Sequence, residues 1–386
     1  MTAVTIVLAA ACVIVLLEST VLFVHLGALR RLPRVSALEP AAWPRVSVVV
    51  AARDEARDVG AAVASRLADD YPELELILVD DRSTDGTGER AREAADGDAR
   101  FTLVRVDELP AGWLGKVHAL HRGVSRATGD WLLFSDGDVA VRPGALRRAV
   151  AHCLAQELDM LALVPAFLSG SVVVDAIWTV FLRGMLVIID PRKVRNPRSR
   201  VAMGSGGFNL VRRSAFERTA GFEDLRLETG DDVGLALMVK RAGGRVDLVD
   251  GSDQVSVPMY RSVGEFLRGI EKNGSTTATI PLPAFVGALA LLWAVVFSPL
   301  PAVALGPPWL RLLGAAALVA YTAGEVAALW RNCRRWLPAL LWPLGALLMS
   351  HGLVRATWLA KRNGGVRWRG TFYPLEELAA GRRVKL

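Results

Sequence analysis

The apolar residues of this chain are spread unevenly, and their distribution predicts a membrane part and a water-soluble part. Residues 3–29 are almost wholly apolar, and long apolar stretches return at 281–304, 307–330 and 336–360. Since about 20 apolar residues cross a bilayer as a helix, the first stretch predicts one transmembrane helix. It is too long for the core of a signal peptide, and no basic residue precedes it.

Basic residues beside these stretches predict which side of the membrane each end faces. Arg30 and Arg31 follow the first stretch directly, and the tail, residues 361–386, is also basic. Because the cytoplasmic flanks of transmembrane helices carry an excess of Lys and Arg, both places are expected to be cytoplasmic. Three full crossings after a cytoplasmic domain would leave the tail outside. We therefore predict that residues 336–360 are re-entrant, with a full crossing as the alternative.

The middle of the chain alternates short β-prone runs with helical patterns. Strands are predicted at 46–51, 74–79 and 101–106 and in the run that ends at Asp136, with helices at 59–68, from about 88, and at 117–126. This alternation is typical of an α/β fold with a parallel sheet and crossover helices. In such sheets, ligands gather beyond the carboxyl ends of the strands.

Three pairs of acids fall at these predicted strand ends. They are Asp54 with Glu55, Asp80 with Asp81, and Asp136 with Asp138. The side chains of Asp136 and Asp138 point to one face, because they lie two residues apart on a strand. Two such carboxylates repel each other unless a cation lies between them. Mg²⁺ or Mn²⁺ with a diphosphate on its far side fits this arrangement; the alternative is a turn with solvated acids.

Two further places carry groups suited to an anionic ligand or to proton transfer. Lys116 follows a glycine at a predicted helix start, where backbone N–H groups help to hold an oxyanion. Asp231 and Asp232 begin another predicted helix, after a glycine-rich segment at 203–210. The alternative for Lys116 is a solvated surface lysine, and for the two acids it is helix capping.

The segment before the glycine-rich stretch is apolar and then basic. Residues 171–189 predict a helix that either lies on the membrane surface or is buried in the protein. Residues 191–200 contain proline and several basic residues and predict a surface loop.

Composition narrows the classes of partner. The chain has 386 residues, 52% of them hydrophobic, and a formal net charge of +7. A basic balance suits an anionic membrane surface or an acidic substrate. Basic runs interleaved with aromatic residues are missing from the soluble part, so a nucleic-acid partner is excluded. The three cysteines show no metal-ligand spacing, so neither a disulfide framework nor a zinc site is indicated.

Taken together, the motifs resemble those of membrane-anchored family 2 glycosyltransferases over roughly residues 46–275. The matching stretches, in chain order, are Arg53-Asp54-Glu55, residues 79–87, Gly115-Lys116, Ser135-Asp136-Gly137-Asp138 and Gly230-Asp231-Asp232. Asp231 stands where the family has Glu. The loop at 109–116 and the tail segment 368–373 are similar to enzymes that glycosylate lipids, such as ceramide glucosyltransferases and hopanoid-associated or carotenoid transferases.

The resemblance implies a GT-A fold, which is a Rossmann-like, mostly parallel sheet flanked by helices, here with N-terminal and C-terminal transmembrane helices. It implies an inverting transfer from a nucleotide-diphosphate sugar, most often a UDP-sugar, to a hydroxyl of a membrane lipid. The protein would be a multi-pass protein of the cytoplasmic (inner) membrane with a cytosolic catalytic domain. The resemblance also implies a role for each matching residue. Contacts to the base and ribose of the donor fall to Asp54, Glu55, Asp80 and Asp81, and contact to the ribose or the metal falls to Asp136. Asp138 would bind the metal, Lys116 and Arg268 would supply positive charge near the diphosphate, and Asp232, beside Asp231, would remove the proton.

The expected organisation follows from these patterns. It comprises an anchor at 1–29, a linker at 30–45, a cytosolic GT-A domain at 46–265, an interfacial segment at 266–283, a transmembrane region of two to three helices at 284–360, and a basic tail at 361–386. A processive polysaccharide synthase is one alternative, although the Gln-x-x-Arg-Trp motif of those enzymes is missing. A non-catalytic scaffold is another, although all the acid clusters are retained. The sequence identifies neither the sugar nor the oligomeric state.

Overall fold

The computed structural model describes residues 2–32 and 40–382. Part of the predicted linker and the tail residues Arg383 and Lys385 lie outside the described residues. The chain divides into two compact units, which are described separately below. We call residues 29–168, 191–258 and 376–386 the sheet unit, and residues 1–28, 169–190 and 259–375 the helical unit.

The sheet unit is built on a seven-stranded sheet in the order β3-β2-β1-β4-β8-β6-β9. All neighbouring strands are parallel except β8, which runs antiparallel to both β4 and β6. The strands are β1 Val46–Ala52, β2 Leu74–Asp81, β3 Phe101–Val106, β4 Trp131–Asp136, β6 Met160–Val164, β8 Asn209–Arg212 and β9 Val246–Asp250. The predicted mostly parallel α/β sheet is therefore confirmed, and the reversal at β8 is an addition to it.

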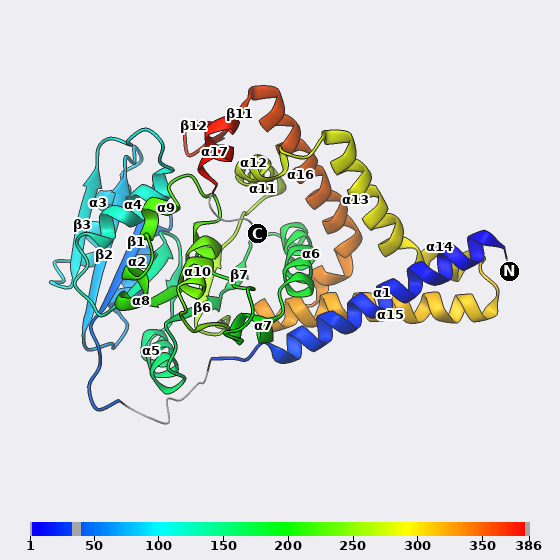
Figure 1. Cartoon of the computed structure of the whole chain (residues 1–386), viewed down its shortest axis with the longest axis horizontal. Coiled ribbons are helices and arrows are strands. Elements are labelled where there is room, and N and C mark those ends of the chain that lie inside the picture. The colour runs from blue at the N-terminus through cyan, green and yellow to red at the C-terminus, as the bar shows by residue number, and fades with distance from the viewer. Residues whose placement is uncertain (1, 33–39, 383–386) are drawn as a thin grey trace. The chain divides into compact units, whose positions relative to one another are not determined.

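Helices cover this sheet (Figure 1). The helices of the sheet unit are α2 Val59–Leu67, α3 Thr87–Ala95, α4 Gly115–Val124, α5 Ala145–Ala155, α7 Pro191–Arg195, α8 Arg213–Glu217, α9 Gly221–Asp224 and α10 Asp231–Arg241, together with α17 Leu375–Gly381 near the C-terminus. Strand β1 is buried along nearly its whole length, as expected for a parallel strand covered on both faces. A small second sheet joins β5 Ala140–Val141, β10 Val255–Pro258 and β7 Ala166–Leu168. The short helix α7 stands where the sequence predicted a loop.

The register of the central strands brings the predicted acid clusters to one edge. Ala52 of β1 pairs with Asp80 of β2, and Ala51 pairs with Asp136 of β4. Because β1, β2 and β4 are parallel, their carboxyl ends all open on the same edge of the sheet. Residues far apart in sequence are thus neighbours there.

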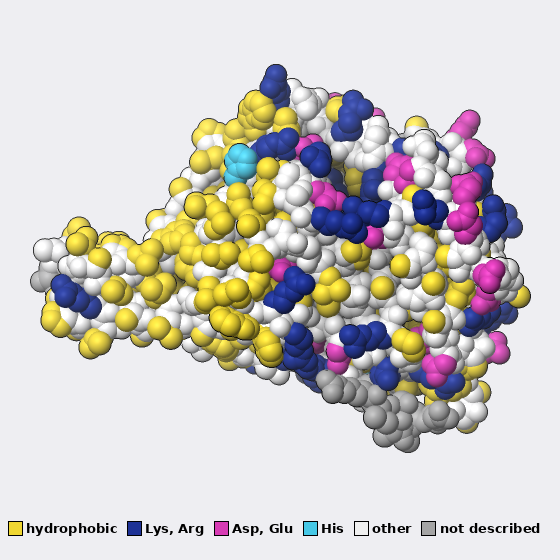
Figure 2. Space-filling model, turned by 180° about the vertical axis from the view of Figure 1, so that it is seen from behind, with side chains coloured by type: hydrophobic (Ala, Val, Ile, Leu, Met, Phe, Trp, Pro, Cys, Tyr) yellow, Lys and Arg dark blue, Asp and Glu magenta, His cyan; other side chains and the backbone are white. Residues whose placement is uncertain are grey.

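The helical unit contains the apolar stretches. Its main helices are α1 Ala3–Ala28, α6 Val172–Ile188, α11 Val263–Gly269, α12 Gly274–Thr277, α13 Leu282–Phe297, α14 Pro299–Leu305, α15 Pro308–Cys333 and α16 Trp342–Asn363. The hairpin of β11 Gly365–Trp368 and β12 Thr371–Pro374 follows. Within the described residues, three helical runs are long and apolar enough to cross a membrane, or four if one bent pair counts as a span. Hydrophobic side chains crowd the visible face of this unit (Figure 2), and many on α1, α13 and α15 are exposed, as bilayer-facing residues are.

The re-entrant form predicted for residues 336–360 is not what the structure has. A short 3₁₀ turn, Leu337–Leu341, leads into the long helix α16. Pro343 lies in the first turn of α16, where its missing N–H costs no hydrogen bond. The sharp bend, of 112°, lies instead between the helices that end at Thr277 and α13.

Helix α6 lies inside the range predicted for the glycosyltransferase domain, but it packs with the helical unit. One face is buried, with Ile177 fully covered, whereas Phe181 and Ile188 are 41% and 77% exposed. Helix α6 is thus buried on one face, as the buried alternative expects, and a position on the membrane surface stays a prediction.

Candidate active site

The carboxyl end of β2 presents two carboxylates that are fixed by the turn after them. Arg82 adopts a left-handed backbone conformation with φ of 59°. Its guanidinium then donates to both oxygens of Asp81, at 2.8 and 3.0 Å. The backbone N–H of Ser83 donates to Asp80 Oδ1 at 3.2 Å. The Asp81 carboxyl group is therefore held in a defined orientation.

The loop after β1 is tied to this turn. The N–H of Asp54 donates to Ser83 Oγ at 3.0 Å, and the N–H of Thr84 donates to Asp54 Oδ1 at 3.0 Å. The N–H of Glu55 donates to Thr87 Oγ1 at 2.8 Å. The predicted residues Asp54 and Glu55 are thus placed beside Asp80 and Asp81.

Lys116 joins two other acid clusters. Its Nζ lies 2.7 Å from Asp136 Oδ1 and 3.3 Å from Asp231 Oδ2. Burial by itself would lower the pKa of Lys116, but the carboxylates of Asp136, Asp231 and Asp232 raise it above its usual value. Lys116 is therefore a fixed positive charge, and the solvated-lysine alternative does not hold.

The two acids at the start of α10 differ in their surroundings. Asp231 is buried, and this burial raises its pKa to about 6, with Lys116 opposing the shift and Asp232 adding to it. Asp232 is only half-buried, and its Oδ1 accepts from the N–H of Val233 at 2.9 Å. Asp231 is thus committed to Lys116, whereas part of the Asp232 carboxylate faces outward. The N-cap residue of α10 is Gly230, so neither Asp231 nor Asp232 occupies the capping position.

Three glycines allow the chain to approach these groups closely. A Cβ at Gly115 would lie 2.3 Å from Asp81 Oδ2, and one at Gly206 would lie 2.7 Å from Asp136 Oδ2. A Cβ at Gly204 would lie 1.9 Å from the carbonyl oxygen of Asp232. The glycine-rich segment at 203–210 therefore lies directly against the site, because no larger residue would fit.

Gly204→Ala is expected to displace the backbone of Asp232 and to lower kcat/KM for the transfer reaction that the sequence motifs predict by about 10²-fold, the cost of misplacing a catalytic group by about 1 Å. Gly230→Ala is the matched control, since nothing lies within 4 Å of a Cβ at that position. The measurement is transfer rate beside the melting temperature of each variant. Equal activity of the two variants would contradict the close approach.

A residue that the sequence reasoning missed supports the loop of Asp136 and Asp138. Arg66, buried in α2, donates to Ser135 Oγ at 2.8 Å and to the carbonyl oxygen of Asp136 at 2.9 Å. Ser135 Oγ in turn donates to the carbonyl of Gly207 at 2.8 Å. Burial lowers the pKa of Arg66 to about 10, against the attraction of Asp138 and Asp136. The available signal was a lone arginine on the apolar face of a predicted helix.

Arg268 is the one predicted site residue outside this group. It lies in α11 of the helical unit, whereas all the others belong to the sheet unit. Within residues 2–32 and 40–382, no three His, Cys, Asp or Glu side chains gather as a metal-binding cluster. Asp136 and Asp138 are the carboxylates at the end of β4 that could contribute two ligands, with further ligands supplied by a bound phosphate.

Known proteins resemble this chain in sequence. Residues 47–219 match the sequence family described as Glycosyl transferase family 2. The succinoglycan biosynthesis protein ExoO of Rhizobium meliloti is 34% identical over 31% of this chain and 35% of its own length. A 4,4'-diaponeurosporenoate glycosyltransferase of Staphylococcus aureus is 24% identical over 64% of this chain and 65% of its own length. The chain thus spans about a third of the first of these relatives and less than two thirds of the second.

A solved structure covers more of the chain. The mannosyltransferase PcManGT of Pyrobaculum calidifontis, determined with GDP-Man and Mn²⁺, superposes with a TM-score of 0.52 and 21% identity. The match covers 93% of this chain and 98% of that one. At this identity the likeness is one of fold. Residues 47–219 therefore match a family of enzymes, glycosyl transferase family 2, and the sheet unit has the GT-A fold.

Proposed function

We propose that this chain is an inverting glycosyltransferase that moves a sugar from a nucleotide-diphosphate sugar, a UDP-sugar, to a hydroxyl of a membrane lipid. The observation that carries the proposal is the position of Lys116 between Asp136 and Asp231. The Lys116 cation thereby brings the acid pair at the end of β4 and the acid pair at the start of α10 into one site. Such a site suits the departure of a diphosphate and the removal of a proton.

The donor's nucleoside would lie at the ends of β1 and β2. Asp54, Glu55, Asp80 and Asp81 offer hydrogen-bond acceptors for the N–H and hydroxyl groups of base and ribose. Lys116 would face the diphosphate, where a fixed positive charge stabilises the leaving group.

Proton removal is assigned to Asp232. Its carboxylate is more exposed than that of Asp231 and is not paired with Lys116 in an ion pair of the described structure. It would accept the proton of the acceptor hydroxyl as that oxygen attacks the anomeric carbon from the face opposite the leaving diphosphate. Asp231 instead holds Lys116 in place.

A divalent cation, Mg²⁺ or Mn²⁺, is proposed at Asp138 and Asp136. Both side chains are half-buried at the end of β4, and their oxygens are the donor type these cations prefer. When bound, the cation would neutralise charge on the departing diphosphate. Arg66 fixes the backbone that carries both carboxylates.

Asp138→Ala is expected to weaken metal-dependent donor binding by about tenfold or more, since a direct carboxylate ligand is lost. EDTA should stop turnover of the wild type, and added Mg²⁺ or Mn²⁺ should restore it. Glu93→Ala, an exposed acid near the C-terminal end of α3, is the control and should bind donor normally. Undiminished turnover of the wild type in EDTA would remove the metal from this proposal.

The lipid acceptor is supported by the helical unit and by one relative. Exposed apolar side chains lie along helices that are long enough to cross a bilayer. One relative is, by its name, a glycosyltransferase of 4,4'-diaponeurosporenoate. We place the protein in the cytoplasmic (inner) membrane as a multi-pass protein, with its sheet unit in the cytosol.

Mass spectrometry of lipid extracts from cells with and without the protein tests the function. We expect a lipid that is heavier by one sugar residue only when the protein is present. A ladder of products would favour a processive synthase. Purified protein that releases no nucleoside diphosphate from a panel of donors would favour a non-catalytic scaffold.

A further inference from the structure

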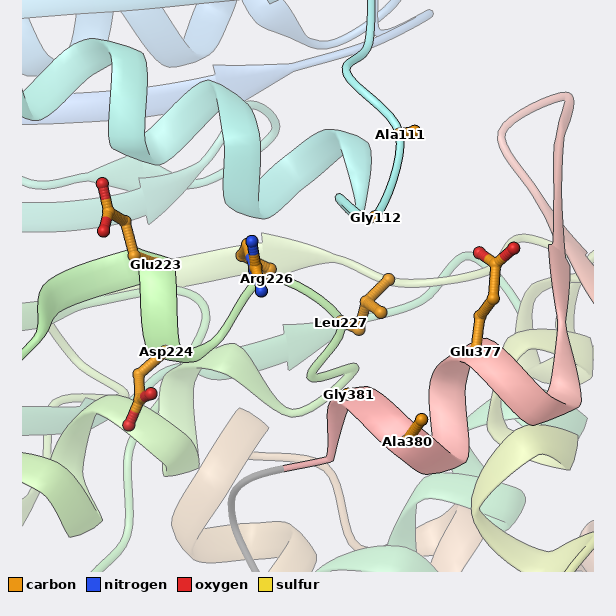
Figure 3. Close-up of a pocket in the computed structure, with 9 residues that line it drawn as sticks. All are labelled: Ala111, Gly112, Glu223, Asp224, Arg226, Leu227, Glu377, Ala380 and Gly381. Carbon is orange, nitrogen blue, oxygen red and sulfur yellow. The ribbon is translucent and has the colours of Figure 1, made fainter.

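The sheet unit contains a cavity of about 490 Å³ that the donor and metal assignments leave unused. Figure 3 shows it between the loop at Ala111 and Gly112 and the last helix, α17. Leu227 lies between these two walls, and Glu377 extends from α17 toward the loop. Its volume is within the range of small-molecule sites.

Two of the segments that line the cavity lead directly to the active site. Gly112 is four residues before Lys116, and Leu227 is four residues before Asp231. Four residues span at most about 14 Å, and the two segments meet where Lys116 Nζ lies 3.3 Å from Asp231. The N–H of Leu114 also donates to the carbonyl of Arg226 at 2.7 Å, which ties the loop to the segment of Leu227. The cavity therefore adjoins the reacting centre.

The lining of the cavity combines apolar residues with charged side chains. Ala111, Leu227 and Ala380 are apolar, and Gly112 and Gly381 leave the backbone accessible. The charged lining residues are Glu223, Asp224, Arg226 and Glu377. In the part of the chain that the structure describes, these four side chains form no ion pair with one another.

This lining selects a type of ligand. Carboxylates accept hydrogen bonds from hydroxyl groups and the guanidinium donates to ring or hydroxyl oxygens, while the apolar residues suit the C–H face of a sugar ring. Three acids against one arginine leave the lining negative. A phosphate or carboxylate would be repelled there. The lining thus fits a neutral group that carries several hydroxyls.

We infer that this cavity binds the headgroup of the lipid acceptor, and that this headgroup is a neutral sugar or polyol. The inference rests on the proposed function and narrows it, because it excludes acceptors whose accepting hydroxyl lies beside a phosphate. The loop at Ala111 and Gly112 would then contact the acceptor, while Lys116, at the end of the same loop, faces the donor.

The test uses the full chain with two kinds of vesicle, one of phosphatidylcholine with monoglucosyl diacylglycerol and one of phosphatidylcholine with phosphatidylglycerol, whose free hydroxyls lie beside a phosphate. The wild type should transfer sugar to the first and not to the second. Ala380→Trp, which fills the cavity, and Glu377→Gln, which removes one charge, should raise the KM for monoglucosyl diacylglycerol by about tenfold or more, the loss expected for one hydrogen bond to a charged group. Glu376→Gln is the matched control, since Glu376 is exposed and does not line the cavity.

Donor hydrolysis without acceptor is measured for every variant, because it separates a failure of the acceptor-site inference from a failure of the proposed function. It should be unchanged in Ala380→Trp and Glu377→Gln, since the donor site is intact. If both variants hydrolyse donor and keep the wild-type KM for acceptor, the cavity is not the acceptor site, although the proposed function stands. Equal transfer to phosphatidylglycerol would also overturn the inference. A wild type that releases no nucleoside diphosphate overturns the proposed function and the inference with it.

Discussion

Asp232→Asn is expected to abolish sugar transfer while donor binding stays nearly intact. The amide cannot take the proton of the acceptor hydroxyl, and general-base catalysis typically contributes about 10²- to 10⁴-fold. Because Asp232 makes no direct ion pair with Lys116 in the described structure, whereas Asp231 does, the donor side of the site should be undisturbed. The measurement is kcat for transfer beside the Kd of the donor, determined by calorimetry.

Asp231→Asn is the contrasting variant. Loss of its charge removes one of the carboxylates that hold Lys116, so this variant should weaken donor binding as well as turnover. If Asp232→Asn retains full transfer activity, Asp232 is not the base. If the two variants exchange these behaviours, the roles of the two acids must be reversed.

Arg183→Ala is expected to destabilise the helical unit by about 3–5 kcal/mol, because it removes one partner of a buried ionic network. Arg183 is 3% exposed on α6. Its Nε donates to Glu18 Oε1 of α1 at 2.9 Å and lies 3.8 Å from Glu325 Oε1 of α15. Its guanidinium also lies over the ring of Tyr321, 3.6 Å from the centroid. The substitution leaves two carboxylates among apolar helices, and thermal unfolding in detergent should show a lower Tm.

A triple variant separates the loss of charge balance from the loss of packing. Arg183→Met combined with Glu18→Gln and Glu325→Gln removes all three charges and keeps side chains of similar volume. Replacing a whole buried ionic group is often neutral or stabilising, so the triple variant should recover most of the lost stability. An Arg183→Ala variant as stable as the wild type would show that the network does not hold α1, α6 and α15 together.

Local patterns determined much of this protein before any contact was known. The β-prone runs and the helical periods between them predicted a mostly parallel sheet, because a parallel strand needs a crossover helix. The positions of Asp54, Asp80 and Asp136 at strand ends then predicted one shared edge, because parallel strands end on the same side. Long apolar stretches predicted membrane helices, because length and composition alone decide whether a helix can cross a bilayer.

Other features depend on contacts between distant residues, and the sequence could not show them. The reversal of β8 depends on which strand edges are free, and the support of Asp136 by Arg66 joins residues 70 positions apart. The same holds for α6, whose place in the helical unit rests on partners in α1 and α15. The sequence resemblance assigned proton removal to Asp232, but it could not show what Asp231 does. Only the tertiary structure shows that Lys116, 115 residues before Asp231, pairs with Asp231.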